Sequence, residues 1–145
     1  MMEAVDILIG TSDPQEVQTI REALRVLMNR VTVLSEPRSV RDYLQKHGEW
    51  KDERRTPELV IVDMELMNGD DCWTLLGKLS EREAYRRTTW AALVEEPGKR
   101  DADRAYAAGV DWLMAKPLTV RAMAELVDEL EDKAMAVVRV SRTGR

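Results

Sequence analysis

Five short apolar runs alternate with amphipathic stretches along almost the whole chain, and this alternation constrains the fold more than any other feature. The runs cover residues 5–9, 31–34, 59–62, 89–94 and 111–115. Because a stretch with helical spacing separates each run from the next, the strands should be parallel and joined by helical crossovers. The sequence therefore predicts an α/β fold of the (βα)5 kind, with a doubly wound parallel sheet in the order 2-1-3-4-5.

Start and stop residues divide the stretches between the runs into helices. Ser12 or Asp13 can cap the first helix, and Ser39 is expected to cap the second. Asp101 should start the fourth helix, which Gly109 should close. The apolar stripe of the first helix is expected at Val17, Ile20, Leu24, Leu27 and Met28.

The chain of 145 residues has the length of one domain. We place that domain over residues 1–132, with a last helix over about 120–135. Residues 133–145 form a C-terminal extension whose basic end, 139–145, we expect to be partly disordered. The polar segment 47–57 should be an exposed loop.

Composition excludes several classes of protein. The chain has 22 Lys and Arg residues against 27 Asp and Glu residues, which argues against a protein that coats nucleic acid or an anionic membrane. Cys72 is the only cysteine and His47 the only histidine, so an internal disulfide and a Cys- or His-rich metal site are excluded. With neither a membrane-length apolar run nor a signal peptide in the sequence, we expect a cytoplasmic protein.

Polar side chains follow the predicted strands, at the edge where open parallel sheets bind their ligands. These residues are Thr11, Ser12, Asp13, Asp63, Glu65, Glu95, Glu96 and Lys116. A carboxylate that closes a buried strand (Asp63), with Lys116 before a proline at a neighbouring strand end, is an unusual pair. On these residues alone, a structural ion pair and a functional site are equally good interpretations.

The order of elements, Asp63 at the end of the third strand and Lys116 at the end of the fifth together resemble the receiver domain of bacterial response regulators. The resemblance covers residues 5–132, and the segment 109–111 that leads into Lys116 is similar to that family's last-strand signature. It implies the flavodoxin-like receiver fold of two-component signal transduction and phosphorelay. The loop before the third strand resembles that of the single-domain subgroup that partners phytochrome-type kinases.

The resemblance also implies roles for individual residues. Asp63 would be the phosphoacceptor that attacks a phosphohistidine of a sensor histidine kinase, and Lys116 would contact the phosphoryl oxygens. Asp63 and the backbone carbonyl of Glu65 would be ligands of Mg²⁺, which usually neutralises the transferring group.

Several positions depart from the family's pattern, among them Met67 where a proline and Asp71 where a glycine is expected. The acidic pair after the first strand falls on Thr11 and Ser12, the hydroxyl residue of the fourth strand on Val94, and the switch aromatic on Leu113. Without the pair, we expect Mg²⁺ to bind weakly or not at all, with no other cofactor. We therefore interpret the chain as a divergent receiver, or pseudo-receiver, that is not an enzyme and acts by protein–protein contact.

Two alternatives stay open. Asp63 is a working phosphoacceptor if Asp13, Asp70 or Glu95 repairs the metal site. Less favoured is a small phosphohydrolase with Asp63 as its nucleophile, because Glu65 stands where that motif needs aspartate.

We also expect the chain to form a homodimer through a face made by the fourth helix, the fifth strand and the fifth helix. Apolar residues continue beyond the length of helix that a monomer core needs, at Met135, Val137, Val138 and Val140. The partners are thus a sensor histidine kinase or another signalling protein and a second copy, without nucleic acid or membrane.

Overall fold

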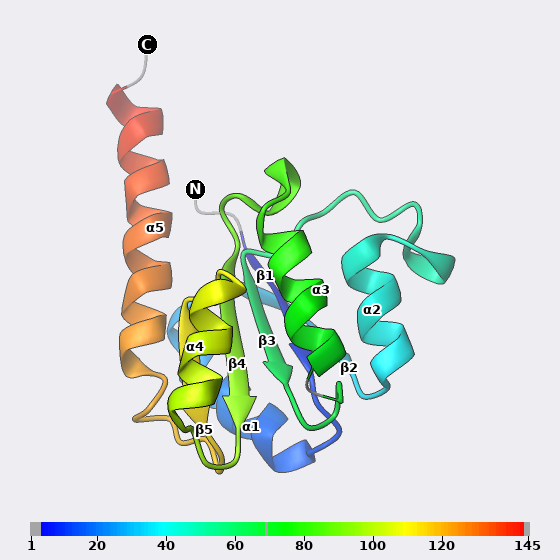
Figure 1. Ribbon diagram of the computed structural model, residues 1–145. Helices are drawn as coiled ribbons and strands as arrows, with labels where there is room; N and C mark the ends of the chain where they lie inside the picture. Colours follow the sequence, from blue (N-terminus) through cyan, green and yellow to red (C-terminus); the bar gives the residue numbers. More distant parts are fainter. Residues whose placement is uncertain (1–3, 69, 144–145) are drawn as a thin grey trace.

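Five parallel strands form one sheet in the order β2-β1-β3-β4-β5 (Figure 1), which confirms the predicted topology. The computed structural model describes residues 4–68 and 70–143, and their side chains over 4–68 and 71–133. The strands are β1 (Val5–Gly10), β2 (Asn29–Leu34), β3 (Leu59–Asp63), β4 (Thr89–Val94) and β5 (Trp112–Ala115). The register pairs Asp63 with Leu93 and Gly10 with Val62, so β1, β3 and β4 end at the same edge.

Helices cover both faces of the sheet. α1 (Pro14–Ala23) and α5 (Ala124–Thr143) pack on one face, and α2 (Pro37–Gln45), α3 (Asp70–Ser80) and α4 (Lys99–Ala107) pack on the other (Figure 1). The described residues also contain three short 3₁₀ helices: η1 (Leu24–Val26), η2 (Gly48–Trp50) and η3 (Glu83–Tyr85). The described helices include none that is long and apolar enough to cross a membrane.

Strand alternation divides the core into two clusters. Ile61 belongs to the cluster beneath α1 and α5, whereas Val60 belongs to the cluster beneath α2, α3 and α4. The same rule separates Trp112 from Leu113, and the Trp112 Nε1 donates a hydrogen bond to Glu129 of α5 at 3.0 Å. All residues of β3 are buried, which explains why its sequence is continuously apolar up to its last residue.

The ends of α1 and α2 differ partly from the sequence-based expectation. Asp13 caps α1 as predicted, but the helix ends at Ala23, and Met28, expected on the apolar stripe, is 65% exposed. Met28 is not buried because the 3₁₀ helix at 24–26 changes the direction of the chain before position 28. α2 begins at Pro37, so Ser39 lies inside its first turn and is not the cap.

α4 is fixed at both of its ends. It begins two residues before Asp101, whose carboxylate accepts the N–H of the N-cap residue Gly98 at 3.3 Å. Gly109 follows the C-cap residue, Ala108, and has a φ of +74°. A Cβ at Gly109 would lie 2.7 Å from the Ser80 Oγ, so both conformation and space require glycine.

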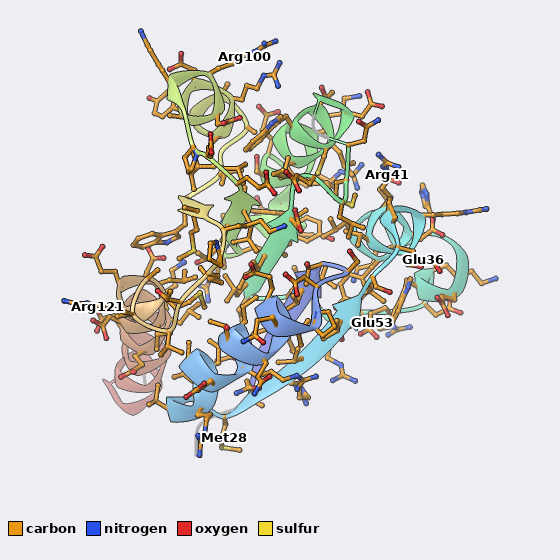
Figure 2. All side chains as sticks on the ribbon, turned by 90° about the horizontal axis from the view of Figure 1, so that it is seen from below. Met28, Glu36, Arg41, Glu53, Arg100 and Arg121 are labelled. Carbon is orange, nitrogen blue, oxygen red and sulfur yellow. The ribbon has the colours of Figure 1, made fainter. Side chains whose placement is uncertain are left out.

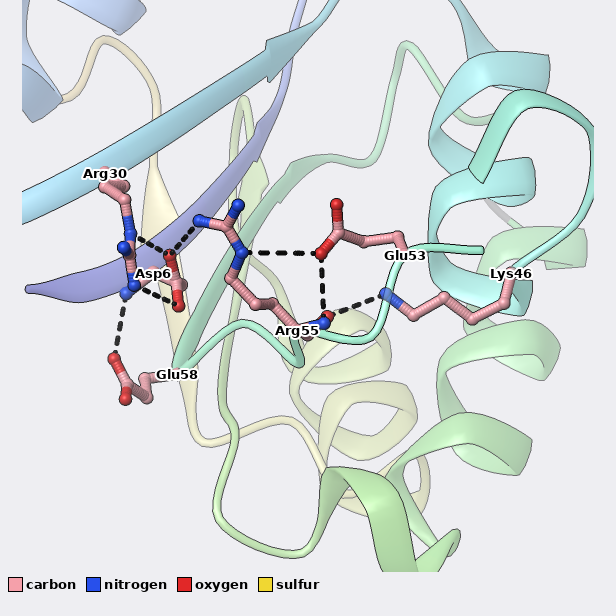
Figure 3. A network of polar contacts seen from close by, with 6 residues as sticks. All are labelled: Asp6, Arg30, Lys46, Glu53, Arg55 and Glu58. Atoms are coloured by element: carbon pink, nitrogen blue, oxygen red, sulfur yellow. Dashed lines mark hydrogen bonds and ion pairs between the residues drawn. The ribbon is translucent and has the colours of Figure 1, made fainter. Parts of the chain in front are cut away.

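The polar segment 47–57 is anchored to the sheet rather than free. At the edge where the strands begin, Asp6 of β1 pairs with Arg30 of β2 at 2.8 Å and with Arg55 at 3.9 Å (Figure 3). Arg55 also pairs with Glu53 at 3.6 Å, and Trp50 packs against the core. This network lies at the opposite edge of the sheet from Asp63.

α5 extends further than the sequence pattern predicts. It spans Ala124–Thr143 instead of about 120–135, so residues 139–143, expected to be partly disordered, are helical. The expected domain boundary at residue 132 falls inside this continuous helix. In Figure 1 the helix begins near the edge where the strands end and continues past the opposite edge. The side chains of the expected apolar extension, from Met135 on, lie outside the described residues.

Candidate functional site

Asp63 and Lys116 meet at the carboxyl edge of the sheet, which Figure 2 views from below. The Lys116 Nζ lies 2.8 Å from the Asp63 Oδ2. Asp63 is the last residue of β3 and is only 4% exposed, and Lys116 directly follows β5. The Lys116 N–H donates to the Val94 carbonyl at 2.9 Å, which holds the end of β5 beside β4. The predicted juxtaposition is therefore present.

Three donors from three different strand ends surround the Asp63 carboxylate. The Glu65 N–H donates to Oδ1 at 3.0 Å, while the Lys116 ammonium and the Thr11 hydroxyl, the latter at 3.4 Å, donate to Oδ2. Thr11 is 2% exposed, so its hydroxyl contacts the carboxylate out of reach of solvent. Each oxygen of Asp63 is thus satisfied from within the chain.

Lys116 is the cation of this site. Its hydrogen bond to Asp63 raises the pKa of Lys116, although burial of the ammonium acts in the opposite direction. The Glu65 carboxylate, whose side chain is 55% exposed, lies 3.9 Å from the same nitrogen. The positive charge is therefore shared between two carboxylates, and the buried one, Asp63, has the shorter contact.

Among the described side chains, the loop after β1 does not supply the carboxylate pair that Mg²⁺ takes. Thr11 and Ser12 carry no charge, and the Asp13 carboxylate accepts the Gln15 N–H at 2.9 Å as the cap of α1. Glu95 is exposed. Among the side chains that the structure describes, no three His, Cys, Asp or Glu residues are grouped closely enough to hold a metal ion. The side chain of Asp70 lies outside that set.

The two other positions that depart from the receiver pattern, Val94 and Leu113, lie in the core. Val94 is buried at the end of β4, and Leu113 packs against the same cluster from β5. Both side chains are aliphatic, so neither can exchange a hydrogen bond with a group at Asp63.

Sequence reasoning missed one charged residue near the site. Glu16 of α1 is 3% exposed, and its Oε1 accepts the Leu118 N–H at 3.4 Å. A signal was available, because Glu16 lies four residues before Ile20 and seven before Ala23 on the apolar stripe of α1. A carboxylate on a core-facing stripe indicates a buried polar contact.

Two residues have the ordinary environments that the sequence indicates. Burial raises the pKa of the Cys72 thiol to about 12, so the thiol is inert. His47 is exposed between α2 and η2.

The fold has many counterparts among solved structures. A bacteriophytochrome response regulator, RtBRR, is 20% identical with a TM-score of 0.70, over 88% of this chain and 78% of that one. The phosphorylated cyanobacterial phytochrome response regulator RcpA is 18% identical with a TM-score of 0.71, over 93% and 96%. This chain has the receiver-domain fold of response regulators.

Solved receiver domains outside the phytochrome subgroup also match this chain. A CheY-like receiver domain protein from Methanospirillum hungatei is 16% identical with a TM-score of 0.69, over 92% of this chain and 98% of that one. Phytochrome response regulators and CheY-like receivers are thus equally similar in fold. No family model matches the sequence, and no curated protein matches it either.

Proposed function

We propose that this chain is a cytoplasmic receiver module of a two-component system that acts by protein–protein contact and has a degenerate phosphorylation site. The observation that carries the proposal is that both oxygens of the Asp63 carboxylate accept hydrogen bonds from within the chain. The donors are the Lys116 ammonium, the Thr11 hydroxyl and the Glu65 N–H. In this proposal Asp63 keeps the acceptor position and Lys116 the phosphoryl-contacting position. Loss of the acidic pair at Thr11 and Ser12 leaves Mg²⁺ binding weak or absent.

The same proposal explains the aliphatic residues at the switch positions. A receiver changes its surface when a hydroxyl on β4 and an aromatic on β5 respond to the phosphoryl group. Val94 and Leu113 cannot make that response, so the contact surface keeps one state. The module is a signalling partner rather than an enzyme, and its buried, inert Cys72 suits a reducing compartment.

Treatment with acetyl phosphate should leave the intact mass of the protein unchanged, with or without Mg²⁺. The reason is that Asp63 lacks the metal that neutralises the incoming phosphoryl group. Mass spectrometry of the intact protein checks this, with an ordinary receiver treated in parallel. A mass gain that requires Mg²⁺ and disappears in Asp63→Ala would instead establish a working phosphoacceptor.

We further propose that the chain associates with a second copy through the face of α4, β5 and α5. The support is the length of α5, which continues to Thr143, whereas its last buried residue among those described is Leu130. The sequence beyond residue 133 stays apolar at Met135 and Val138, and apolar residues on a helix that has left its own sheet favour burial against another chain.

Sedimentation of the full chain should show a dimer, and a version ending at Asp132 should be a monomer whose helical circular dichroism falls only by the share of the deleted helical residues 133–143. Neither result should change with acetyl phosphate, because Val94 and Leu113 do not couple the site to this face. A full chain that stays monomeric at high concentration contradicts self-association. A dimer that forms only with acetyl phosphate contradicts the uncoupled switch.

A further inference from the structure

A cavity of about 340 Å³ opens at the edge of the sheet where the strands begin, opposite to the edge that carries Asp63. It lies between the ends of α3 and α4, and Trp90, the second residue of β4, forms part of its wall. Its volume is at the lower end of the range for small-molecule sites, so the cavity has room for a compact ligand.

Trp90 brings an unused hydrogen-bond donor to this cavity. The residue is only 3% exposed, and its backbone N–H donates to the Asp111 carboxylate at 2.8 Å, whereas its indole N–H makes no hydrogen bond within the described residues. The buried side-chain atoms that lack a partner in that part of the chain are Glu16 Oε2 and Trp50 Nε1. The Trp90 nitrogen is therefore not sealed in the core and reaches the cavity that its side chain lines. A ligand with an oxygen acceptor would satisfy this donor.

The charges around the cavity favour a cation. α3 and α4 both end at this edge, so two helix C-termini, each with partial negative charge, border the cavity (Figure 1). The carboxylates of Glu81 and Asp111 belong to the same lining. The one cationic side chain among the described lining residues is Arg86, and its guanidinium pairs with Glu83 at 3.1 Å. An ammonium ion would thus meet mostly opposite charge, and an anion mostly like charge.

Aromatic rings complete the cavity. Tyr85 and Trp90 are both buried, with ring centroids 5.3 Å apart, while Tyr106 of α4 belongs to the lining and is 88% exposed. Aromatic rings attract organic cations through their π faces, and they attract uncharged groups of the same shape less strongly. The lining therefore combines three features that suit one ligand: rings, carboxylates and a free donor.

We propose that this cavity is a binding site for a small organic ammonium ion that carries a hydroxyl group, which is the chemistry of an amino alcohol. In this site the ammonium lies near the Glu81 and Asp111 carboxylates and the Tyr106 ring, and the hydroxyl oxygen accepts the Trp90 indole N–H. Binding is weak, because both carboxylates are exposed and screened by solvent. The site goes beyond the signalling function proposed above and does not rest on it.

Titration of the full chain with choline, followed by nuclear magnetic resonance, tests the site. The indole N–H signal of Trp90, assigned by triple-resonance spectra, should shift and saturate as choline is added. The matched probe is dimethylbutanol, the uncharged analogue in which carbon replaces the nitrogen of choline. It should bind about tenfold more weakly, because it loses the attraction to the carboxylates and to the ring, each worth roughly threefold.

Four variants at exposed positions test the lining residues. Glu81→Gln and Tyr106→Ala should each weaken choline binding by roughly threefold. Arg86→Gln removes the cation of the lining and should tighten choline binding. The control is Asp103→Asn, which removes an exposed carboxylate of α4 outside the lining and should leave choline binding unchanged. Circular dichroism checks that each variant is folded.

A Trp90 indole signal that does not move with choline overturns the site. Equal affinity for choline and dimethylbutanol, or a tighter effect of acetate than of choline on the same signal, overturns the preference for a cation. None of these measurements involves acetyl phosphate or Asp63, so a failure of the proposed signalling function leaves their outcome unaffected.

Discussion

Replacing Lys116 by methionine should lower the free energy of unfolding by about 3 kcal/mol, because the change leaves a buried charge without its counter-ion. Asp63 would keep only the Glu65 N–H and the more distant Thr11 hydroxyl as donors. Urea unfolding at pH 7, followed by tryptophan fluorescence, measures the loss. Since the pKa of Lys116 is raised, the stabilisation should persist through neutral pH and decline only as pH rises above the ordinary lysine value.

Two further variants separate the ion pair from its surroundings. Lys99→Met, on the exposed start of α4, is the matched control and should change stability by less than about 0.5 kcal/mol. The double variant Asp63→Asn with Lys116→Met removes both charges and should be more stable than Lys116→Met alone. If Lys116→Met is as mild as Lys99→Met, the pair does not hold the site together.

Restoring the acidic pair, by Thr11→Glu with Ser12→Asp, should tighten Mg²⁺ binding by roughly a hundredfold. The reasoning is that each added carboxylate contributes on the order of 1.4 kcal/mol of attraction to the cation, or tenfold in affinity. Titration calorimetry on the wild type and on the variant measures the difference.

The control for this experiment is Thr11→Gln with Ser12→Asn, which has nearly the same shape without charge and should bind Mg²⁺ as weakly as the wild type. In the absence of metal, the acidic variant should also be less stable than this control, because Glu at position 11 would repel Asp63. A wild-type protein that binds Mg²⁺ as tightly as an ordinary receiver would remove the basis for the degenerate site.

The sheet and the central pair were predictable because both follow from local rules. β3 is apolar until Asp63, and the ends of parallel strands lie at one edge, so Asp63 and Lys116 were expected at the same edge, where Lys116 reaches Asp63 past the end of β4. The alternation of Trp112 and Leu113 between faces follows from strand geometry in the same way.

The errors concern contacts that no local pattern encodes. Glu16 is buried by a partner 102 positions away, and its place on an apolar stripe was the only sign in the sequence. Ser39 was favoured as a cap by residue type, although Pro37 already marks the first helical residue. The segment around Arg55 is exposed, as predicted, but its ion pair with Asp6 was not predicted, because that contact depends on β1 and the segment lying side by side.

In the proposed receiver module, α5 is the element that joins the Asp63 edge of the sheet to the opposite edge. The helix starts beside the edge that carries Asp63 and ends beyond the opposite edge, a run of 20 residues that spans about 30 Å (Figure 1). A protein gripping its far end would touch nothing of the chemistry at Asp63. Such a protein would respond only to a tilt or rotation of α5. The packing of Leu126 and Leu130 against the sheet would then determine how a shift at one end of the helix moves the other end.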